Sequence, residues 1–237
     1  MGKLRKGSLI DDVDVRGWWG DGPPILFTNP QIRKMLNLSK AGKDDVFFDL
    51  GSGWGQNLII AASEFGVKRC VGVENSKARC QKARGRIKKW ENEDRIKIDQ
   101  IKIINCSYID AIEAKVRNVK LSDATVIFFG LDDLRAWKIM RRNDLPRRGC
   151  RFVYYNLTLF PDIMPDENGV DNPFYVSTAP FNPPKSKLEW LRAVVGIERP
   201  FLLTKEIQEL RDELSHDYNV EEQSQKAIER YGIQFRT

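Results

Sequence analysis

Short apolar runs alternate with amphipathic stretches through the middle of this sequence. The runs rich in Val, Ile and Phe, which predict strands, are residues 45–50, 70–74, 98–104, 124–129 and 151–155. The stretches with apolar residues at helical spacing lie between them, at residues 57–65, 76–91, 109–116 and 134–140. This alternation predicts a doubly wound α/β domain, in which helices cover both faces of a mostly parallel sheet.

The pattern changes after the fifth predicted strand. Residues 174–180 and 187–195 are both strand-like, and the turn-forming sequence F-N-P-P separates them. Two strands joined in this way predict an antiparallel hairpin at the edge of the sheet. After Pro200 the pattern becomes helical. We therefore expect an N-terminal arm over residues 1–24, the α/β domain over 25–199 and a helical C-terminal extension over 200–237.

A glycine-rich loop joins the first predicted strand to the first helix that follows it. Residues 49–56 read D-L-G-S-G-W-G-Q. At such a place backbone N–H groups and a helix N-terminus face a ligand, and glycine allows the close approach. The spacing is G-x-G-x-G, which differs from the dinucleotide fingerprint G-x-G-x-x-G, and no Gly-Lys-Ser/Thr follows, which excludes a P-loop.

Two acidic residues flank this loop. Asp49 lies two residues before the first glycine, where it would repel a pyrophosphate but suits a ligand that carries an ammonium group. Glu74 ends the second predicted strand, where a carboxylate can accept hydrogen bonds from both hydroxyls of a ribose. The alternative is a capping or loop carboxylate at Asp49 and a solvated strand end at Glu74. Taken together, the acids and glycines favour a site for S-adenosylmethionine.

Composition and charge limit the function further. The longest apolar run, residues 124–131, is far too short to span a bilayer, and no apolar leader follows the first residues. We expect an intracellular protein, either cytoplasmic or associated with chromatin or a nucleoid. Four scattered cysteines without a C-x-x-C pair predict free thiols, and with His216 as the single histidine we expect no metal site and no His-based triad.

At the glycine loop the chain resembles the class I (seven-strand) methyltransferases, whose motif is D/E-x-G-x-G-x-G with an acid ending the second strand. The closer resemblance is to the DOT-type histone-lysine methyltransferases and the related small archaeal protein-lysine methyltransferases. The loop sequence is similar to the DOT-type D-L-G-S-G-x-G-Q. Residues 27–36, F-T-N-P-Q-I-R-K-M-L, are similar to the V-P-T-P segment and helix that precede the motif in the archaeal and mitochondrial lysine methyltransferases. The resemblance covers about residues 25–155, and it implies a Rossmann-like, seven-stranded sheet and S-adenosylmethionine as the cofactor.

The resemblance also implies a set of cofactor contacts. Asp49, Gly51, Gly53 and Gln56 are expected on the methionine side, and Glu74 at the ribose. In the loop after the third strand, Ser107 stands where the family places an acid and Tyr108 where it places an aromatic residue. The full expected set is Thr28, Asp49, Gly51, Ser52, Gly53, Gln56, Glu74, Ser107 and Tyr108.

Candidate catalytic residues follow the fourth and fifth strands. Methyl transfer is an in-line displacement, which requires alignment, exclusion of water and a neutral nucleophile. Asp132 or Asp133 would help a lysine ammonium lose its proton, and the alternative for both is an ordinary acid at a helix N-terminus. Phe129 and Tyr154 are candidates for the wall of a narrow channel for an alkyl-ammonium, and the alternative for both is core packing.

The strongest electrostatic feature is a basic helix in a chain of net charge +6. It comprises Lys77, Arg79, Lys82, Arg84, Arg86, Lys88 and Lys89. These side chains would contact phosphates if the substrate is a protein bound to DNA or RNA, together with Arg141, Arg142, Arg147, Arg148 and Arg151. The alternative is a solvated helix face.

Three functions remain open from the sequence. The favoured one is a protein-lysine methyltransferase, which the DOT-type resemblance implies. The second is a methyltransferase that acts on RNA or DNA. The third is a methyltransferase fold that serves as a nucleic-acid-binding module without turnover, against which the intact Asp49, Gly51 and Glu74 argue.

Overall fold

The computed structural model describes residues 27–117, 119–130, 133–155, 163–168 and 174–185. The expected N-terminal arm and helical C-terminal extension lie outside these residues, as does the second strand of the expected hairpin. Within the described part, no helix combines the length and the apolar character that crossing a membrane requires.

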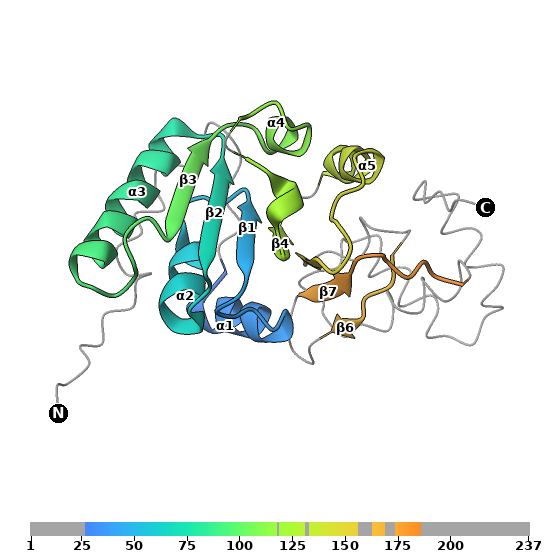
Figure 1. Cartoon of the computed structure of the whole chain (residues 1–237), viewed down its shortest axis with the longest axis horizontal. Helices are drawn as coiled ribbons and strands as arrows, with labels where there is room; N and C mark the ends of the chain where they lie inside the picture. The colour runs from blue at the N-terminus through green and yellow to red at the C-terminus, as the bar shows by residue number, and fades with distance from the viewer. Residues whose placement is uncertain (1–26, 118, 131–132, 156–162, 169–173, 186–237) are drawn as a thin grey trace, which may run out of the picture.

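The described strands form one seven-stranded sheet in the order β3-β2-β1-β4-β5-β7-β6 (Figure 1). They are β1 (Val46–Leu50), β2 (Arg69–Glu74), β3 (Ile101–Asn105), β4 (Val126–Phe129), β5 (Arg151–Tyr154), β6 (Glu167–Asn168) and β7 (Tyr175–Thr178). The neighbours from β3 to β5 pair in parallel, whereas β7 runs antiparallel to both β5 and β6. This confirms the expected α/β class with an antiparallel edge.

One of the two strands of the edge hairpin is not the segment that the sequence predicted. β7 falls within the predicted run 174–180, but its described hairpin partner is β6, which precedes it in the chain. A strand of two residues has no periodicity to detect, so the sequence did not reveal it. The run 187–195, predicted as the partner, lies outside the described residues.

Helices cover both faces of the sheet, as the strand–helix alternation predicted. The helices are α1 (Asn29–Leu38), α2 (Gln56–Phe65), α3 (Lys77–Asn92), α4 (Tyr108–Ile112), the 3-10 helix η1 (Leu121–Asp123) and α5 (Leu134–Arg142). One core cluster joins α1, α2 and α3 to the sheet face that carries Phe47 and Phe128. The other joins α4, η1 and α5 to the face that carries Phe48 and Phe129. Alternate side chains of each buried strand therefore fill the two cores.

One strand and one helix are shorter than the sequence predicted. The strand expected to begin at residue 98 begins at Ile101, because Ile98 is 79% exposed and Asp99 has a φ of 59°, which turns the chain. The Gln100 side chain donates to the Val67 carbonyl at 2.6 Å and thereby anchors this turn to the domain. The helix expected over 109–116 ends at Ile112, and Ala114 follows it with a φ of 55°.

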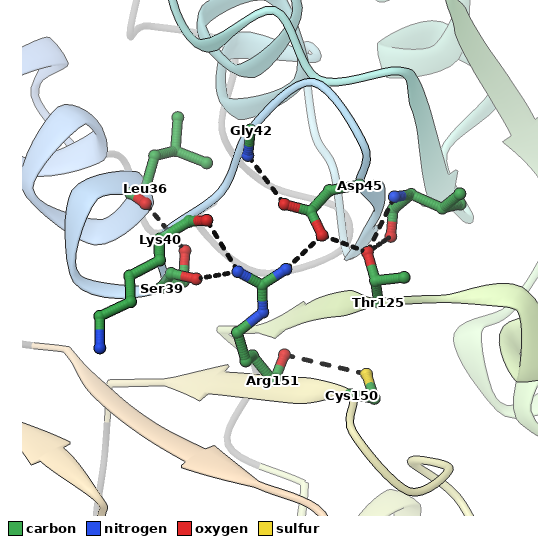
Figure 2. A network of polar contacts seen from close by, with 9 residues as sticks. Leu36, Ser39, Lys40, Gly42, Asp45, Thr125, Cys150 and Arg151 are labelled. Atoms are coloured by element: carbon green, nitrogen blue, oxygen red, sulfur yellow. Dashed lines mark hydrogen bonds and ion pairs between the residues drawn. The ribbon is translucent and has the colours of Figure 1, made fainter.

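Figure 2 shows a polar cluster that fastens the amino ends of β1, β4 and β5 together. Arg151 donates to the carbonyl oxygens of Ser39 and Lys40, each at 2.7 Å, and forms an ion pair with Asp45. Thr125 donates to the Asp45 carboxylate at 2.7 Å and accepts from the backbone of β1 at 2.9 Å. The guanidinium of Arg151 is therefore engaged inside the domain, and a contact between Arg151 and phosphates stays a prediction.

Candidate functional site

The candidate site lies at the carboxyl ends of the parallel strands. β1 sits between β2 and β4, and the winding of the chain reverses at this point of the sheet. In open α/β sheets ligands bind in the crevice outside the carboxyl ends of the strands at such a switch point. Leu50 lies opposite Val73 on one side and Phe129 on the other, so the ends of β1, β2 and β4 are level.

The glycine loop folds back over β2 directly after β1 ends. The backbone N–H groups of Gly51 and Ser52 both donate to the Val73 carbonyl, at 2.8 and 3.0 Å. Gly51, Gly53 and Gly55 have φ values of 94°, 53° and 75°, which residues with a Cβ rarely adopt. Gly55 then caps α2 with no side-chain hydrogen bond, so the N–H groups of the first turn of α2 keep the capacity to bind a ligand.

Asp49 is buried at the end of β1, with 1% of its surface exposed. Its Oδ2 accepts a hydrogen bond from the Asn57 side chain at 3.1 Å, while its Oδ1 has no hydrogen-bond partner among the described residues. Desolvation raises the pKa of Asp49 to about 7; the Asn57 hydrogen bond opposes the shift and the charge of Glu74 adds to it. A cationic group beside Oδ1 would both satisfy this oxygen and stabilise the carboxylate.

Ser52 belongs to the glycine loop, and its side chain lies against Gly72 of β2. Its buried hydroxyl has no hydrogen-bond partner among the described residues, and a Cβ built on Gly72 would lie 2.5 Å from this oxygen. Only glycine at position 72 lets the loop sit this close to β2. The sequence prediction placed Ser52 among the cofactor contacts but overlooked Gly72, which looks like an ordinary strand residue in the sequence.

Glu74 ends β2 with its carboxylate turned toward the loop. Its Oε2 accepts from the Gly53 N–H at 2.9 Å, and its Oε1 accepts from the Ser76 N–H at 2.8 Å. Arg79 of α3 pairs with the same carboxylate at 3.4 Å. Oε1 thus accepts from both the Ser76 N–H and Arg79, whereas Oε2 keeps one lone pair, so Glu74 can hold the loop and accept a hydrogen bond from a ligand hydroxyl through Oε2 at the same time.

The start of α1 joins the site through Gln56. The Gln56 side chain donates to the Asn29 side chain at 2.8 Å and accepts from Arg86. Thr28 caps α1: its hydroxyl accepts from the Gln31 N–H at 3.4 Å, and its own N–H donates to the Gln31 side chain at 2.8 Å. Because Thr28 directly precedes Asn29, the contact between Gln56 and Asn29 brings two of the expected cofactor residues, Thr28 and Gln56, to one edge of the loop.

The loop after β3 meets the end of β4 through a side-chain pair. Tyr108 donates from its hydroxyl to Asp133 Oδ2 at 2.7 Å, and Asp133 Oδ1 accepts from the Ala136 N–H of α5 at 3.1 Å. Ser107 caps α4, because its hydroxyl accepts from the Ile109 N–H at 3.1 Å. The structure thus brings together a residue expected at the adenine, Tyr108, and a residue expected at the substrate amine, Asp133.

The remaining candidate catalytic residues are placed differently. Phe129 and Tyr154 are buried in the core that α4 and α5 cover, where both lie in stacked contact with Phe152. Tyr154 also shares a hydrogen bond of 3.0 Å with the Ser177 hydroxyl. Asp132 lies outside the described residues. A channel-lining role for Phe129 and Tyr154 and a catalytic role for Asp132 stay predictions.

The basic helix α3 divides into an engaged and an exposed part. Arg79 pairs with Glu74, Arg84 donates to the Ile103 carbonyl at 2.9 Å, and Arg86 donates to the Trp54 carbonyl at 3.1 Å. The ammonium of Lys82 lies 4.4 Å from the centre of the Trp54 ring. The side chains of Lys77, Lys88 and Lys89 are exposed. The helix therefore serves the glycine loop on one side and presents lysines to solvent on the other.

Comparison with known proteins supports the motif and the fold. A family described as "Histone methylation protein DOT1" matches residues 27–130, which is less than half of the chain. A protein-lysine N-methyltransferase from Saccharolobus islandicus (strain REY15A) is 43% identical over 58 residues, which cover 24% of this chain and 36% of that protein. The H3 lysine-79 specific histone-lysine N-methyltransferase of Drosophila melanogaster is 40% identical over 45 residues, which cover 19% of this chain and 2% of that protein.

Among solved structures, an RNA methyltransferase from Salinibacter ruber, in complex with S-adenosyl-L-homocysteine, matches with a TM-score of 0.53. The match is 23% identical and covers 68% of this chain and 98% of that chain. At this identity the likeness establishes the fold. The sheet order, the glycine motif and these matches together show that the chain has the class I methyltransferase fold.

Proposed function

We propose that this protein is an S-adenosylmethionine-dependent methyltransferase that methylates lysine side chains of a protein. The observation that carries the methyl-donor site is the buried Asp49, whose Oδ1 has no hydrogen-bond partner among the described residues. The ammonium group of the donor's methionine part would supply that partner. Glu74, on the adjacent strand, would bind the ribose hydroxyls.

The other expected contacts complete the same site. The backbone of Gly51, Ser52 and Gly53 and the first turn of α2 would follow the methionine part, with Gln56 and Thr28 at its edge. Ser107 and Tyr108 would face the adenine side. When bound, the donor supplies an electrophilic methyl group on a sulfonium, so the chain itself has to align the acceptor and exclude water.

The lysine substrate is supported by the names of the two curated relatives. Both are lysine methyltransferases, and their similarity to this chain spans only a part of each protein. A lysine ammonium must lose its proton before it attacks a methyl group. Asp133, oriented by Tyr108 and by the N-terminus of α5, is suited to accept a hydrogen bond from the amine, and Asp132 is its alternative.

A nucleic-acid-associated protein is the substrate class that the charge favours. The exposed Lys77, Lys88 and Lys89 continue the positive surface of a chain with net charge +6. Such a surface raises the encounter rate with an anionic complex, and that rate falls as salt is added.

The test is methyl transfer from tritiated S-adenosylmethionine to separate pools of basic protein, RNA and DNA. We expect label that protease releases and nuclease does not, located on lysine after hydrolysis. The Asp49→Asn variant is the control and is expected to leave the pools unlabelled, because a neutral amide cannot neutralise the donor's ammonium.

Two outcomes would contradict the proposal. Label that nuclease removes would assign the protein to the RNA or DNA methyltransferases instead. Calorimetry without heat from S-adenosylhomocysteine, on folded protein, would remove the methyl-donor site itself and leave a nucleic-acid-binding module without turnover as the alternative.

A further inference from the structure

Arg86 is a basic residue of α3 that is turned inward. Its side chain is half-buried, and desolvation lowers the pKa of its guanidinium. One nitrogen donates to the Trp54 carbonyl at 3.1 Å, and a second donates to the Gln56 side-chain oxygen. A guanidinium is costly to bury unless its N–H groups find acceptors, and here both acceptors belong to the glycine loop and the first residue of α2.

The contact extends beyond the loop. Gln56 accepts from Arg86 through its oxygen and donates through its nitrogen to Asn29 at 2.8 Å. A single chain of side-chain hydrogen bonds therefore connects α3, the start of α2 and the start of α1. The starts of α1 and α2 carry expected contacts to the methyl donor, since Thr28 directly precedes Asn29 and Gln56 is itself one of them, and α3 supplies the cation that joins them.

The loop needs such a fastening. Glycine residues lose more conformational freedom on folding than other residues, and three of them occur within residues 51–55. α2 begins at Gln56, and its N-cap Gly55 has no side chain with which to fix the end of the loop. Lys82, one helical turn before Arg86, lies over the Trp54 ring at 4.4 Å. Two cations of α3 thus hold the single bulky residue of the loop.

We propose that Arg86 is a positioning residue for the methyl-donor site: it holds the glycine loop and the start of α1 in the conformation that binds the donor. This inference rests on the proposed function for its ligand. Arg86 thereby leaves the set of side chains expected to contact phosphates, and its charge is used within the domain.

The test compares Arg86→Met with Arg84→Met. Arg84 is two residues away on the same helix and also donates to a backbone carbonyl, but that carbonyl belongs to Ile103 of β3. The two variants therefore lose the same charge and the same side-chain type. Two quantities are measured: the affinity for S-adenosylhomocysteine by calorimetry, and the hydrogen exchange of the Gly53 and Gly55 amides in ligand-free protein.

We expect Arg86→Met to weaken S-adenosylhomocysteine binding about 10- to 100-fold, since it removes two charge-assisted hydrogen bonds from the loop. Arg84→Met is expected to bind within about threefold of wild type. The loop amides should exchange about tenfold faster in Arg86→Met and at the wild-type rate in Arg84→Met. Arg86→Lys, which keeps the charge but cannot bridge both acceptors, should recover part of the affinity.

The outcomes separate this inference from the proposed function. Equal binding by Arg86→Met and Arg84→Met, or unchanged loop exchange in Arg86→Met, would overturn the positioning role while the donor site stands. Absence of binding by wild type would overturn the donor site, and the exchange measurement would still decide whether Arg86 fixes the loop. If Arg86→Met does not fold, Arg86→Lys decides both readouts.

Discussion

Two buried aspartates at opposite ends of β1 have different surroundings. Asp45 precedes the strand, and both of its carboxylate oxygens are occupied: Oδ1 by Thr125 and Arg151, and Oδ2 by the Gly42 N–H at 2.8 Å. Asp49 lies toward the other end of the strand with a hydrogen bond on Oδ2 and, within the described residues, none on Oδ1. No cation that the structure describes pairs with Asp49.

The comparison separates a group that stabilises the domain from a group suited to a ligand. A buried charge is tolerated when it is paired and hydrogen-bonded, as at Asp45 (Figure 2). An incompletely satisfied one shifts its pKa, as Asp49 does to about 7. At the amino end of the sheet, residues of the chain itself supply every hydrogen-bond partner of the Asp45 carboxylate. At the carboxyl end, under the proposed function, the bound methyl donor supplies the missing partner of Asp49 Oδ1.

The largest effect on stability is expected from Arg151→Met. It leaves Asp45 buried without its cation and removes donors from the carbonyls of Ser39 and Lys40. We expect a loss of about 3 kcal/mol in the free energy of unfolding, measured by urea denaturation. Because the amino ends of the strands lie away from the donor site, the affinity for S-adenosylhomocysteine should stay within about twofold.

Arg148→Met is the matched control, since Arg148 is exposed in the segment before β5. It is expected to change the free energy of unfolding by less than about 0.5 kcal/mol. A similar loss in both variants would show that the Asp45 cluster does not stabilise the domain in this way.

The next effect is a pH-dependent gain of stability in Asp49→Asn. Because the pKa of Asp49 is raised in the folded state, folding favours the protonated carboxyl, and ionisation lowers the free energy of unfolding as the pH rises through about 7. The difference in unfolding free energy between the variant and wild type should therefore grow by about 2–3 kcal/mol in favour of the variant from pH 5 to pH 8.

Urea denaturation of both proteins at each pH measures this difference, and the other titrating groups cancel in the comparison. The same variant should lose affinity for S-adenosylhomocysteine, so stability and binding change in opposite directions. A difference that stays constant between pH 5 and pH 8 would show that Asp49 is ionised throughout, and the contrast with Asp45 would then disappear.

The smallest effect is expected from Tyr108→Phe. It removes the hydroxyl that donates to Asp133 at 2.7 Å, which should cost about 1 kcal/mol of stability. If Asp133 orients the acceptor amine, the turnover number should fall while KM for the donor changes little. A double-mutant cycle with Asp133→Asn measures the coupling, and additive effects of the two substitutions would show that the pair does not act as a unit.

Most of the sheet was predictable because each strand of the parallel core is a run of buried apolar residues. Phe47, Phe48, Val71, Val73 and Ile127 show this pattern directly, and all are buried. The exposed Ile98 misled the prediction, because an apolar residue in a turn resembles a strand end in a sequence. The hairpin partner β6 was missed for the opposite reason, since two residues give no pattern at all.

The glycine loop and its acids were equally readable, since their chemistry depends on residue type and on short spacing along the chain. Asn57, Arg86 and Gly72 were not recognised as parts of the site, although each contacts or limits it. Asn57 lies 8 positions from its partner Asp49, and Arg86 lies 32 positions from its partner Trp54. Gly72 lies beside Asp49 on the adjacent strand. These contacts arise only when the chain folds, so spacing along the sequence does not reveal them.

By itself the sequence determined the α/β class, the order of the core strands along the chain and the identity of the loop, because burial pattern and local spacing are properties of neighbouring residues. Tertiary structure alone decided which arginine stabilises which segment. Arg86 and Arg151 both carry a charge that looks available for phosphates in the sequence, and each is turned inward because a carbonyl or carboxylate from a distant segment needs a donor there.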